Sequence, residues 1–540
     1  MEHKQGSDRN QLIVLSLESA IPQDSFVRVV DAFVDAIDLK SFGFAHAECK
    51  EEGRPPYHPG ILLKLYLYGY HYGIRTTRKL EREAQTNMEC MWLLTGLRPK
   101  YKTIADFRKD HSKAFREVFR RFVWLLKQWN LVEGKTIAID SFKIRASNSL
   151  KKNYNEKKLK HHLDYIDKQI NQYGDLLDKS EQEEDRKAIQ ERINERREKR
   201  EHYKKIQKEL KESGADQIST TDPDSRSVVL LRNIVNVGYN IQASCDEKHK
   251  LLVDYDTGSV NDTHALAPMA LETKELLQVE HLTVLADKGY HTGEQIKRCM
   301  EGNITTYVSP RGSSTNDKGL YPVTDFKYDP VQDQYICPEG NLMHTNGKWH
   351  DHSDSRRKDK SSYRFKRYTS SACRQCKSRH CCTKSRNGRY IDRSEYAEAL
   401  EGNTQRVLSD PEYYRKRQQI TEHQFGTLKR QRGFTHTNVR GKTKVMGEVG
   451  LMFIGYDLKR CITILGAREL IKVLKECCLP LFLLIKRLIL SQFKTIINFK
   501  FEIAKLKKEI FGVQSIQPIG NNAIFILLKS VFAQTHVSEY

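Results

Sequence analysis

The sequence predicts an α/β protein in which a mixed sheet is preceded by helices and interrupted by two insertions. Two apolar runs carry this prediction because each ends on an aspartate: 136–139 is followed by Asp140, and 282–286 by Asp287. Such runs are typical of buried strands. The segments between them predict two antiparallel strands and then a helix: 235–243, 251–255 and 262–277. This order favours an α/β fold over a sandwich or a bundle.

The charge of the chain indicates the class of its partner. Its 540 residues allow two or three domains, and 91 Lys and Arg against 69 Asp and Glu give a net charge of +22. Residues 356–389 contain 13 basic side chains and one acid, and residues 415–444 contain nine and one. Two such stretches in one chain favour a nucleic acid as the binding partner over the alternative, a solvated charged surface without a partner.

The sequence also predicts where the protein resides. The N-terminus has no signal peptide, and the most apolar run, 477–485, is too short to cross a bilayer. We therefore expect a cytoplasmic protein without a membrane partner, whose twelve cysteines are reduced rather than paired.

The N-terminal residues 1–130 predict a mostly helical domain. Residues 58–70 are densely apolar and aromatic, with Pro59 suited to a first helical turn, and two more helices are expected within 103–126. Compact helices with exposed basic residues can enter a DNA groove, but they can equally form an ordinary bundle. Both interpretations remain open.

The highly charged segment 151–213 predicts a helical hairpin inserted after the first strand. Apolar residues spaced by 4, 3, 4, 3 and 4 form a heptad seam: Leu159, Leu163, Ile166, Ile170, Tyr173 and Leu177. A break is expected between Gly174 and Ser180, before a second helix. The alternative is a dimerising coiled coil.

A second, basic insertion, 310–410, contains most of the cysteine pattern. Cys373 and Cys376 have the spacing with which two thiolates chelate one Zn²⁺. Cys337 with Cys381 or Cys382 would complete four ligands, and His380 is a further candidate. The alternative is a small β insertion with reduced cysteines that bind no metal.

Three acids stand out against the basic background. Asp140 and Asp287 end strands, and Glu422 lies on a predicted helix after 410. Carboxylates that converge on one pocket repel each other unless cations neutralise them, and hard divalent ions with oxygen ligands do so. Two such ions can activate a nucleophile and stabilise the leaving oxygen of a phosphodiester. The basic surface would then hold DNA, and the acids would hold metal.

These motifs resemble those of the DDE transposases of bacterial insertion sequences, in the branch with a Tyr-Arg-Glu-Lys signature. Ile139-Asp140-Ser resembles the first-acid motif, Ala286-Asp287-Lys-Gly-Tyr290 the second, and 414–429 the helix of the third acid. The similarity runs from about residue 15 to 465. It implies an RNase H-like catalytic domain at 131–465 and DNA-end binding by 1–130. The tail, 466–540, lies beyond the similarity, and its apolar patterns predict helices.

The resemblance also implies partners and site residues. Asp140, Asp287 and Glu422 would be catalytic ligands of two Mg²⁺ or Mn²⁺ ions. The DNA contacts would come from the signature residues and from the aromatic residue of the second motif: Tyr414, Arg415, Arg417, Lys429 and Tyr290. The partners would be double-stranded DNA, as terminal inverted repeats and target, and a second copy of the chain in a synaptic homodimer. Such a protein would associate with the bacterial nucleoid.

One spacing departs from the signature. Four residues separate Arg417 from Glu422 where three are usual, whereas Arg415 lies seven before Glu422 and would share its helical face. Which arginine fills the role stays open. Tyr363 or Tyr368 of the second insertion could stack on a flipped base. The alternatives to a transposase are a catalytically silent DNA-binding protein derived from one, and a related nuclease without strand transfer.

Overall fold

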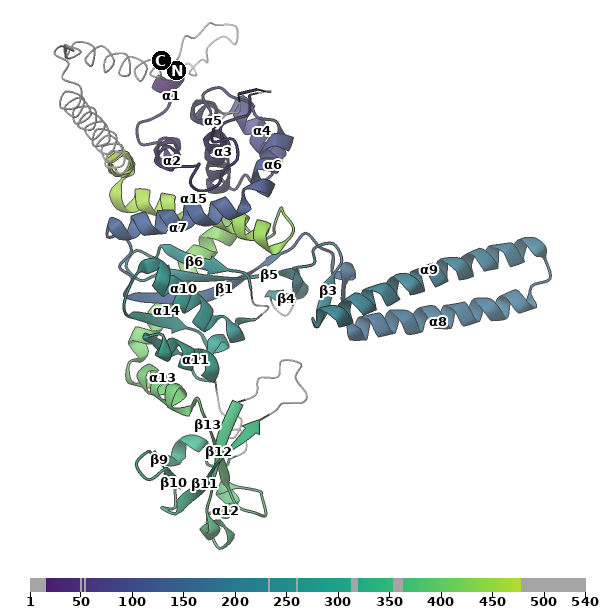
Figure 1. Ribbon diagram of the computed structural model, residues 1–540, viewed down its shortest axis with the longest axis vertical. Helices are drawn as coiled ribbons and strands as arrows, with labels where there is room; N and C mark the ends of the chain where they lie inside the picture. Colours follow the sequence, from purple (N-terminus) through teal and green to yellow (C-terminus); the bar gives the residue numbers. More distant parts are fainter. Residues whose placement is uncertain are drawn as a thin grey trace, which may run out of the picture. The chain divides into compact units, whose positions relative to one another are not determined.

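The computed structural model describes residues 16–48, 51–52, 55–231, 234–258, 261–311, 319–352 and 363–476. The chain divides into two compact units, Met1–Ile471 and Lys472–Tyr540. The first unit is a mixture of helices and sheets, which confirms the α/β class predicted from the sequence (Figure 1). Most of the predicted tail, 466–540, lies outside the described residues.

The chain begins with helices, as predicted. Their bounds are α1 Leu17–Ala20, α2 Phe26–Asp35, α3 Pro59–His71, α4 Thr77–Thr86, α5 Met88–Leu93, α6 Tyr101–Asp110 and α7 Ser112–Gln128. Helix α3 begins at Pro59, where the His58 side chain accepts a hydrogen bond from the Gly60 amide. A late helix, α15 (Lys442–Leu465), packs against α7 and α3. The predicted boundary at residue 130 therefore does not separate two compact units.

The central sheet is mixed. Its strands are β1 Thr136–Arg145, β4 Arg226–Leu231, β5 Ile234–Asp246, β6 Leu252–Asp256, β7 Leu282–Ala286 and β8 Ile304–Val308. The order is β4-β5-β1-β7-β8, with β6 also paired to β5. Strands β4, β1 and β6 are antiparallel to β5, whereas β1, β7 and β8 run parallel to one another. Parallel neighbours need crossovers, and here helices provide them.

Helices cover both faces of this sheet. They are α10 Leu266–Leu277, α11 Gly293–Glu301, α13 Ala397–Ser409 and α14 Pro411–Gly426. On one face Ser244 of β5 bonds Thr273 of α10, with 2.9 Å between the hydroxyl oxygens. On the other face Thr136 of β1 bonds the Tyr413 hydroxyl of α14 at 2.7 Å. Since side chains alternate along a strand, Asp140 shares the Thr136 face and points toward α14.

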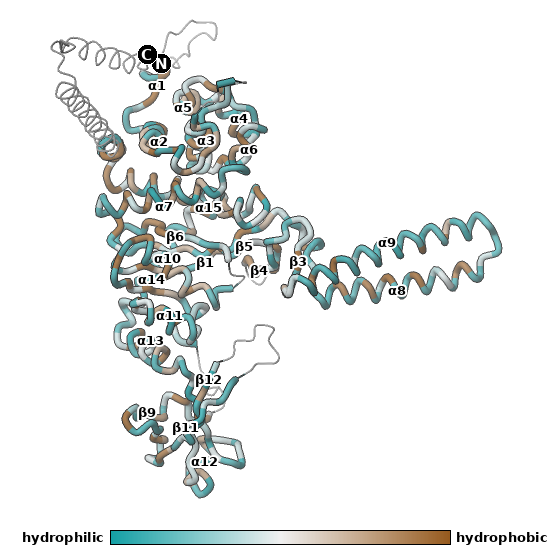
Figure 2. The backbone as a smooth tube through the Cα atoms, viewed as in Figure 1, coloured by the Kyte–Doolittle hydropathy of each residue, from teal (hydrophilic) through white to brown (hydrophobic). Residues whose placement is uncertain are grey.

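The predicted hairpin is present as helices α8 (Glu156–Lys179) and α9 (Glu183–Ser213), which lie side by side (Figure 1). Five apolar side chains of the hairpin are buried: Leu159, Ile166, Ile193, Ile206 and Leu210. The other residues of the predicted seam are partly buried: Leu163, Ile170, Tyr173 and Leu177. Most other positions are hydrophilic (Figure 2). Helix α8 continues through Gly174, so the break expected there is confined to the short connection after Lys179. Strands β2 (Asn153–Asn155) and β3 (Gln217–Ser219) pair at the base.

The cysteine-bearing insertion forms its own antiparallel sheet in the order β13-β12-β11-β10-β9. Its elements are β9 Lys327–Asp329, β10 Gln334–Ile336, β11 Leu342–His352, β12 Tyr363–Thr369, α12 Arg379–Cys382 and β13 Tyr390–Ser394. After it the chain returns at α13, where the Asn403 amide exchanges two hydrogen bonds with the backbone of Val308. Within the described ranges, no helix has the length and apolar character needed to cross a membrane.

Candidate active site

Asp140 and Asp287 lie next to each other because their strands are parallel neighbours in register. Ile139 of β1 pairs with Ala286 of β7, and each of these residues directly precedes one of the two aspartates. Adjacent strands lie about 4.8 Å apart. The structure thus brings together the two acids predicted from the sequence. The prediction that the first strand ends on Asp140 is wrong, because β1 continues to Arg145 in antiparallel pairing with β5.

Helix α14 packs along the same face of β1 and directs two side chains at Asp140. The Arg417 guanidinium donates to Asp140 Oδ2 at 3.1 Å, and the Thr421 hydroxyl donates to the same oxygen at 3.3 Å. Residues four apart share a helical face, which explains why both reach one carboxylate. Arg417, not Arg415, is therefore the arginine at the acid pair.

The electrostatic balance at Asp140 is incomplete. Burial raises the pKa of Asp140, and the negative charge of Asp287 raises it further. The Ser141 amide, Arg417 and Thr421 act in the opposite direction, but the net shift of the pKa is upward. A carboxylate with a second acid beside it and one arginine in contact is short of positive charge.

Glu422 lies on α14 immediately after Thr421, and its side chain is exposed. Within the described part of the chain, no three Asp, Glu, His or Cys side chains are grouped closely enough to hold a metal ion. The structure therefore places Glu422 one residue from a contact of Asp140 but does not join it to the two aspartates.

Lys429 approaches the acids through an irregular turn. Helix α14 ends at Gly426, and a π-helical turn, Thr427–Gln431, follows. The Lys429 ammonium lies 5.5 Å from the centre of the Phe142 ring of β1. Burial and the charge of Lys143 lower its pKa, while Asp140 raises it, and the net shift is downward. The π-helical turn changes the helical register between Glu422 and Lys429.

The other signature residues lie at the surface or near it. Arg415 is exposed and lines a shallow hollow with Asp410, Glu412, Tyr413, Lys416 and Gln419. Tyr414 is half-buried, whereas its neighbour Tyr413 packs on the sheet.

Tyr290 is fully buried, which leaves no ring surface that DNA could reach, so we do not retain it as a DNA contact. Its hydroxyl donates to Gln242 Oε1. The Gln242 and Asn240 amides both donate to Asp262 Oδ1, at 2.7 and 2.9 Å. This network supports the turn that follows Asp287. Sequence reasoning missed it, because tertiary contacts bring Tyr290, Gln242 and Asp262 together from three separate segments.

The insertion corrects two further predictions. Tyr368 is fully buried and donates its hydroxyl to Asp333 at 2.5 Å, so it cannot stack on a flipped base. Tyr363 is partly buried and stacks on His352. The cavity beside the cysteines is lined by Cys337, Cys373, Cys376 and Cys382, and not by Cys381 or His380.

Two family models match the chain. Residues 15–110 are similar to the Transposase domain (DUF772), and residues 336–462 are similar to the Transposase DDE domain. These matches support a DDE-type transposase. The first covers helices α1 to α6, and the second contains α14, with Arg417 and Glu422, and the turn that carries Lys429. Each spans less than half of the chain, and neither includes Asp140 or Asp287.

Other comparisons add little. No curated protein matches the chain. Among solved structures, the chain is similar to a piggyBac transposase synaptic complex with hairpin DNA, at 10% identity and a TM-score of 0.30. That alignment covers 84% of this chain and 79% of the other. A likeness this distant carries no argument about the site.

Proposed function

We propose that the chain is a transposase of the Tyr-Arg-Glu-Lys branch that cuts DNA at the ends of an insertion sequence and joins those ends to a target. The observation that carries this proposal is the pair of adjacent acids, Asp140 and Asp287, facing a helix that lies within the Transposase DDE match. The +22 charge of the chain supports a DNA partner.

The sheet supports an RNase H-like assignment for the catalytic part. Strands β1, β5 and β6 form an antiparallel unit, and β7 and β8 join the free edge of β1 in parallel. This arrangement puts one acid at the centre of the sheet and the second on the neighbouring strand. Helix α14, which follows the cysteine-bearing insertion, covers the face to which Asp140 points.

The donor set suits a divalent cation. Asp140 and Asp287 offer hard oxygen ligands side by side, and the raised pKa of Asp140 reports a deficit of positive charge that a cation would relieve. These two residues would hold Mg²⁺ or Mn²⁺, and Glu422 would complete the set from α14. Two bound ions would activate a water or a 3′-hydroxyl as the nucleophile and would stabilise the leaving oxygen.

The remaining side chains would orient the acids and the DNA. Arg417 and Thr421 fix the Asp140 carboxylate from one side. Lys429 places positive charge near Asp140, where phosphates next to the scissile bond would lie. The proposal includes binding of inverted-repeat DNA by 1–130, a synaptic homodimer, and a location at the bacterial nucleoid.

The test uses DNA fragments from the two ends of the genomic element that encodes the chain. We expect Mg²⁺-dependent nicking and joining by the wild type, and a loss of both of about 10³-fold in Glu422→Gln. Glu412→Gln is the matched control, because it changes an exposed acid in the first turn of the same helix. Equal nicking by the wild type and Glu422→Gln would remove Glu422 from the site. Nicking without joining would indicate a nuclease, and binding without nicking a silent derivative.

A further inference from the structure

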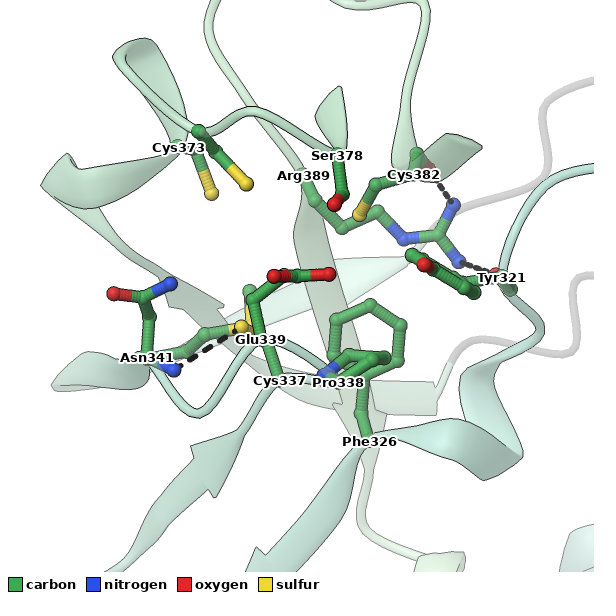
Figure 3. A pocket seen from close by; sticks show the side chains of 12 residues that line it. Tyr321, Phe326, Cys337, Pro338, Glu339, Asn341, Cys373, Ser378, Cys382 and Arg389 are labelled. Atoms are coloured by element: carbon green, nitrogen blue, oxygen red, sulfur yellow. Dashed lines mark hydrogen bonds between the residues drawn. The ribbon is translucent and has the colours of Figure 1, made fainter. Parts of the chain in front are cut away.

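The cysteine-bearing insertion contains a small cavity between its sheet and the segment that follows β12. The cavity measures about 20 Å³ and is lined by four cysteines, Cys337, Cys373, Cys376 and Cys382, with Phe326 and Met343 beneath them. Figure 3 shows the labelled side chains around it. This volume is enough for about one water-sized sphere, so it suits a single ion rather than an organic ligand.

Cys337 lies in a turn in which a backbone amide is directed at its sulfur. The Gly340 amide donates to the Cys337 carbonyl at 2.9 Å, and the Asn341 amide donates to Cys337 Sγ at 3.3 Å. Gly340 has a φ of 77°, a left-handed conformation that glycine adopts without strain. Hydrogen bonds from backbone amides stabilise a thiolate more than a thiol, as they do around metal-bound sulfur.

The other three cysteines come from a short segment that the structure holds close to Cys337. A Cβ atom on Gly388 would lie 2.6 Å from Cys373 Cβ, so the loop after α12 packs directly on Cys373. The Arg389 guanidinium donates to the Cys382 carbonyl at 3.2 Å.

The apolar core of the insertion is small, which favours stabilisation by a cross-link. Its apolar core contains five buried residues: Phe326, Tyr335, Met343, Tyr368 and Ile391. A core of this size rarely stabilises a small sheet alone, and small domains commonly add disulfides or a structural metal. The nine described cysteines are all free, so disulfides do not supply the link.

We propose that Cys337, Cys373, Cys376 and Cys382 bind one structural Zn²⁺ as a four-thiolate site, with Cys382 and not Cys381 as the fourth ligand. The four thiols surround the cavity but are not yet at ligand spacing within the described residues. Zn–S bonds of about 2.3 Å would draw them inward and fix the 370–389 segment to the Cys337 turn. The site is independent of the acids on the central sheet.

The first experiment measures zinc in the full chain, purified under reducing conditions from zinc-supplemented cells. We expect about one Zn²⁺ per chain for the wild type, an unchanged content in Cys381→Ser, and at least a fivefold loss in Cys382→Ser. Cys381→Ser is the matched control because it changes the adjacent thiol, which does not line the cavity. A wild type without zinc, or equal losses in the two variants, would overturn the assignment.

A second experiment needs no variant and so does not depend on the folding of Cys382→Ser. The wild type is alkylated with iodoacetamide before and after zinc chelation, and each cysteine peptide is quantified by mass spectrometry. We expect Cys381 to react at the same rate in both states, and the four proposed ligands to react at least tenfold faster once zinc is removed. Unchanged rates at those four residues would contradict the proposal.

Discussion

Two regions of the molecule pair a carboxylate with arginine, and they differ in how completely the charge is balanced. Glu448 of α15 is fully buried and accepts hydrogen bonds from the Tyr70 hydroxyl, the Arg75 guanidinium and both nitrogens of Asn438. Arg108 lies 3.9 Å away. Burial alone would raise the pKa of Glu448, but Arg108 and Arg75 lower it overall.

Asp140 has the opposite balance. It contacts one arginine, has a second acid as its strand neighbour, and keeps a raised pKa. Its side chain is also partly open to solvent, with 23% of its surface exposed. A buried carboxylate whose charge is balanced by two arginines links the elements that carry its partners, here α15, α6 and the segment after α3. A carboxylate pair that is short of positive charge is suited to bind a cation.

The largest difference between the two regions should appear in activity. We predict that Asp140→Asn reduces metal-dependent nicking about 10³-fold while leaving the free energy of unfolding within about 1 kcal/mol of the wild type, because the substitution removes a poorly balanced charge. Nicking of the DNA ends and urea unfolding of the same preparation measure both quantities. A variant that unfolds readily would show that Asp140 is structural, as Glu448 is.

Much of this contrast could be predicted from the sequence, and part could not. Asp140 and Asp287 each follow a local apolar run, so the hydrophobic pattern of the sequence is enough to select them. The parallel pairing of β1 with β7 then brings them together in the structure. Arg417 could not be chosen over Arg415 in this way, because the spacing rule assumed a regular helix aligned on Glu422. The contact with Asp140 depends on which face of α14 packs on β1, which is a tertiary property.

Long-range partners explain the other failures. No local pattern marks Glu448, because its partners Tyr70, Arg75 and Arg108 lie more than 300 positions away. Tyr290 is predicted to contact DNA from its place in the second-acid motif, and Tyr368 from its residue type, but both side chains are buried. An aromatic residue near a basic run has the same local pattern whether it stacks on a base or fills a core.

Glu448→Gln tests the buried carboxylate whose charge is balanced by arginine. We predict a loss of about 3–5 kcal/mol in the free energy of unfolding at pH 7, since Arg75 and Arg108 would stay buried without an anion. Because the pKa of Glu448 is lowered in the fold, its contribution is present above its unfolded pKa and disappears as the pH falls through the folded value. The difference between variant and wild type should therefore shrink below about pH 4.

Glu272→Gln is the control for that measurement. Glu272 pairs with Arg116 at 2.7 Å, but both side chains are about one-third exposed. We expect a loss of no more than about 1 kcal/mol. Equal losses in Glu448→Gln and Glu272→Gln would show that burial of the Glu448 cluster adds nothing to its effect.

Arg417 and Arg415 provide a smaller, matched contrast on one helix. We predict that Arg417→Gln lowers nicking about 10–100-fold with little change in the salt dependence of DNA binding, because Arg417 orients Asp140. Arg415→Gln, at an exposed position, should change nicking less than about threefold while reducing the slope of binding affinity against salt by about one. The reverse pattern would return the signature role to Arg415.

Asp254 tests whether a raised pKa alone marks a functional acid. Burial, and then the charge of Glu272, raise the pKa of Asp254 to about 7, and its Oδ2 has no hydrogen-bond partner. The strand neighbour of Asp254 is Ser244, whereas Asp140 has a second acid, Asp287, on its neighbouring strand. The raised pKa of Asp254 means that stability is lost as the pH rises from about 4, the unfolded value, through about 7.

We therefore predict that Asp254→Asn is more stable than the wild type above pH 7, by about 1–2 kcal/mol, and that the gain disappears below about pH 4. Thermal unfolding across this pH range measures it, and nicking should be unchanged. A loss of nicking in a stable Asp254→Asn variant would show that desolvation marks function by itself. Unchanged nicking means that the adjacent Asp287, and not burial alone, distinguishes Asp140.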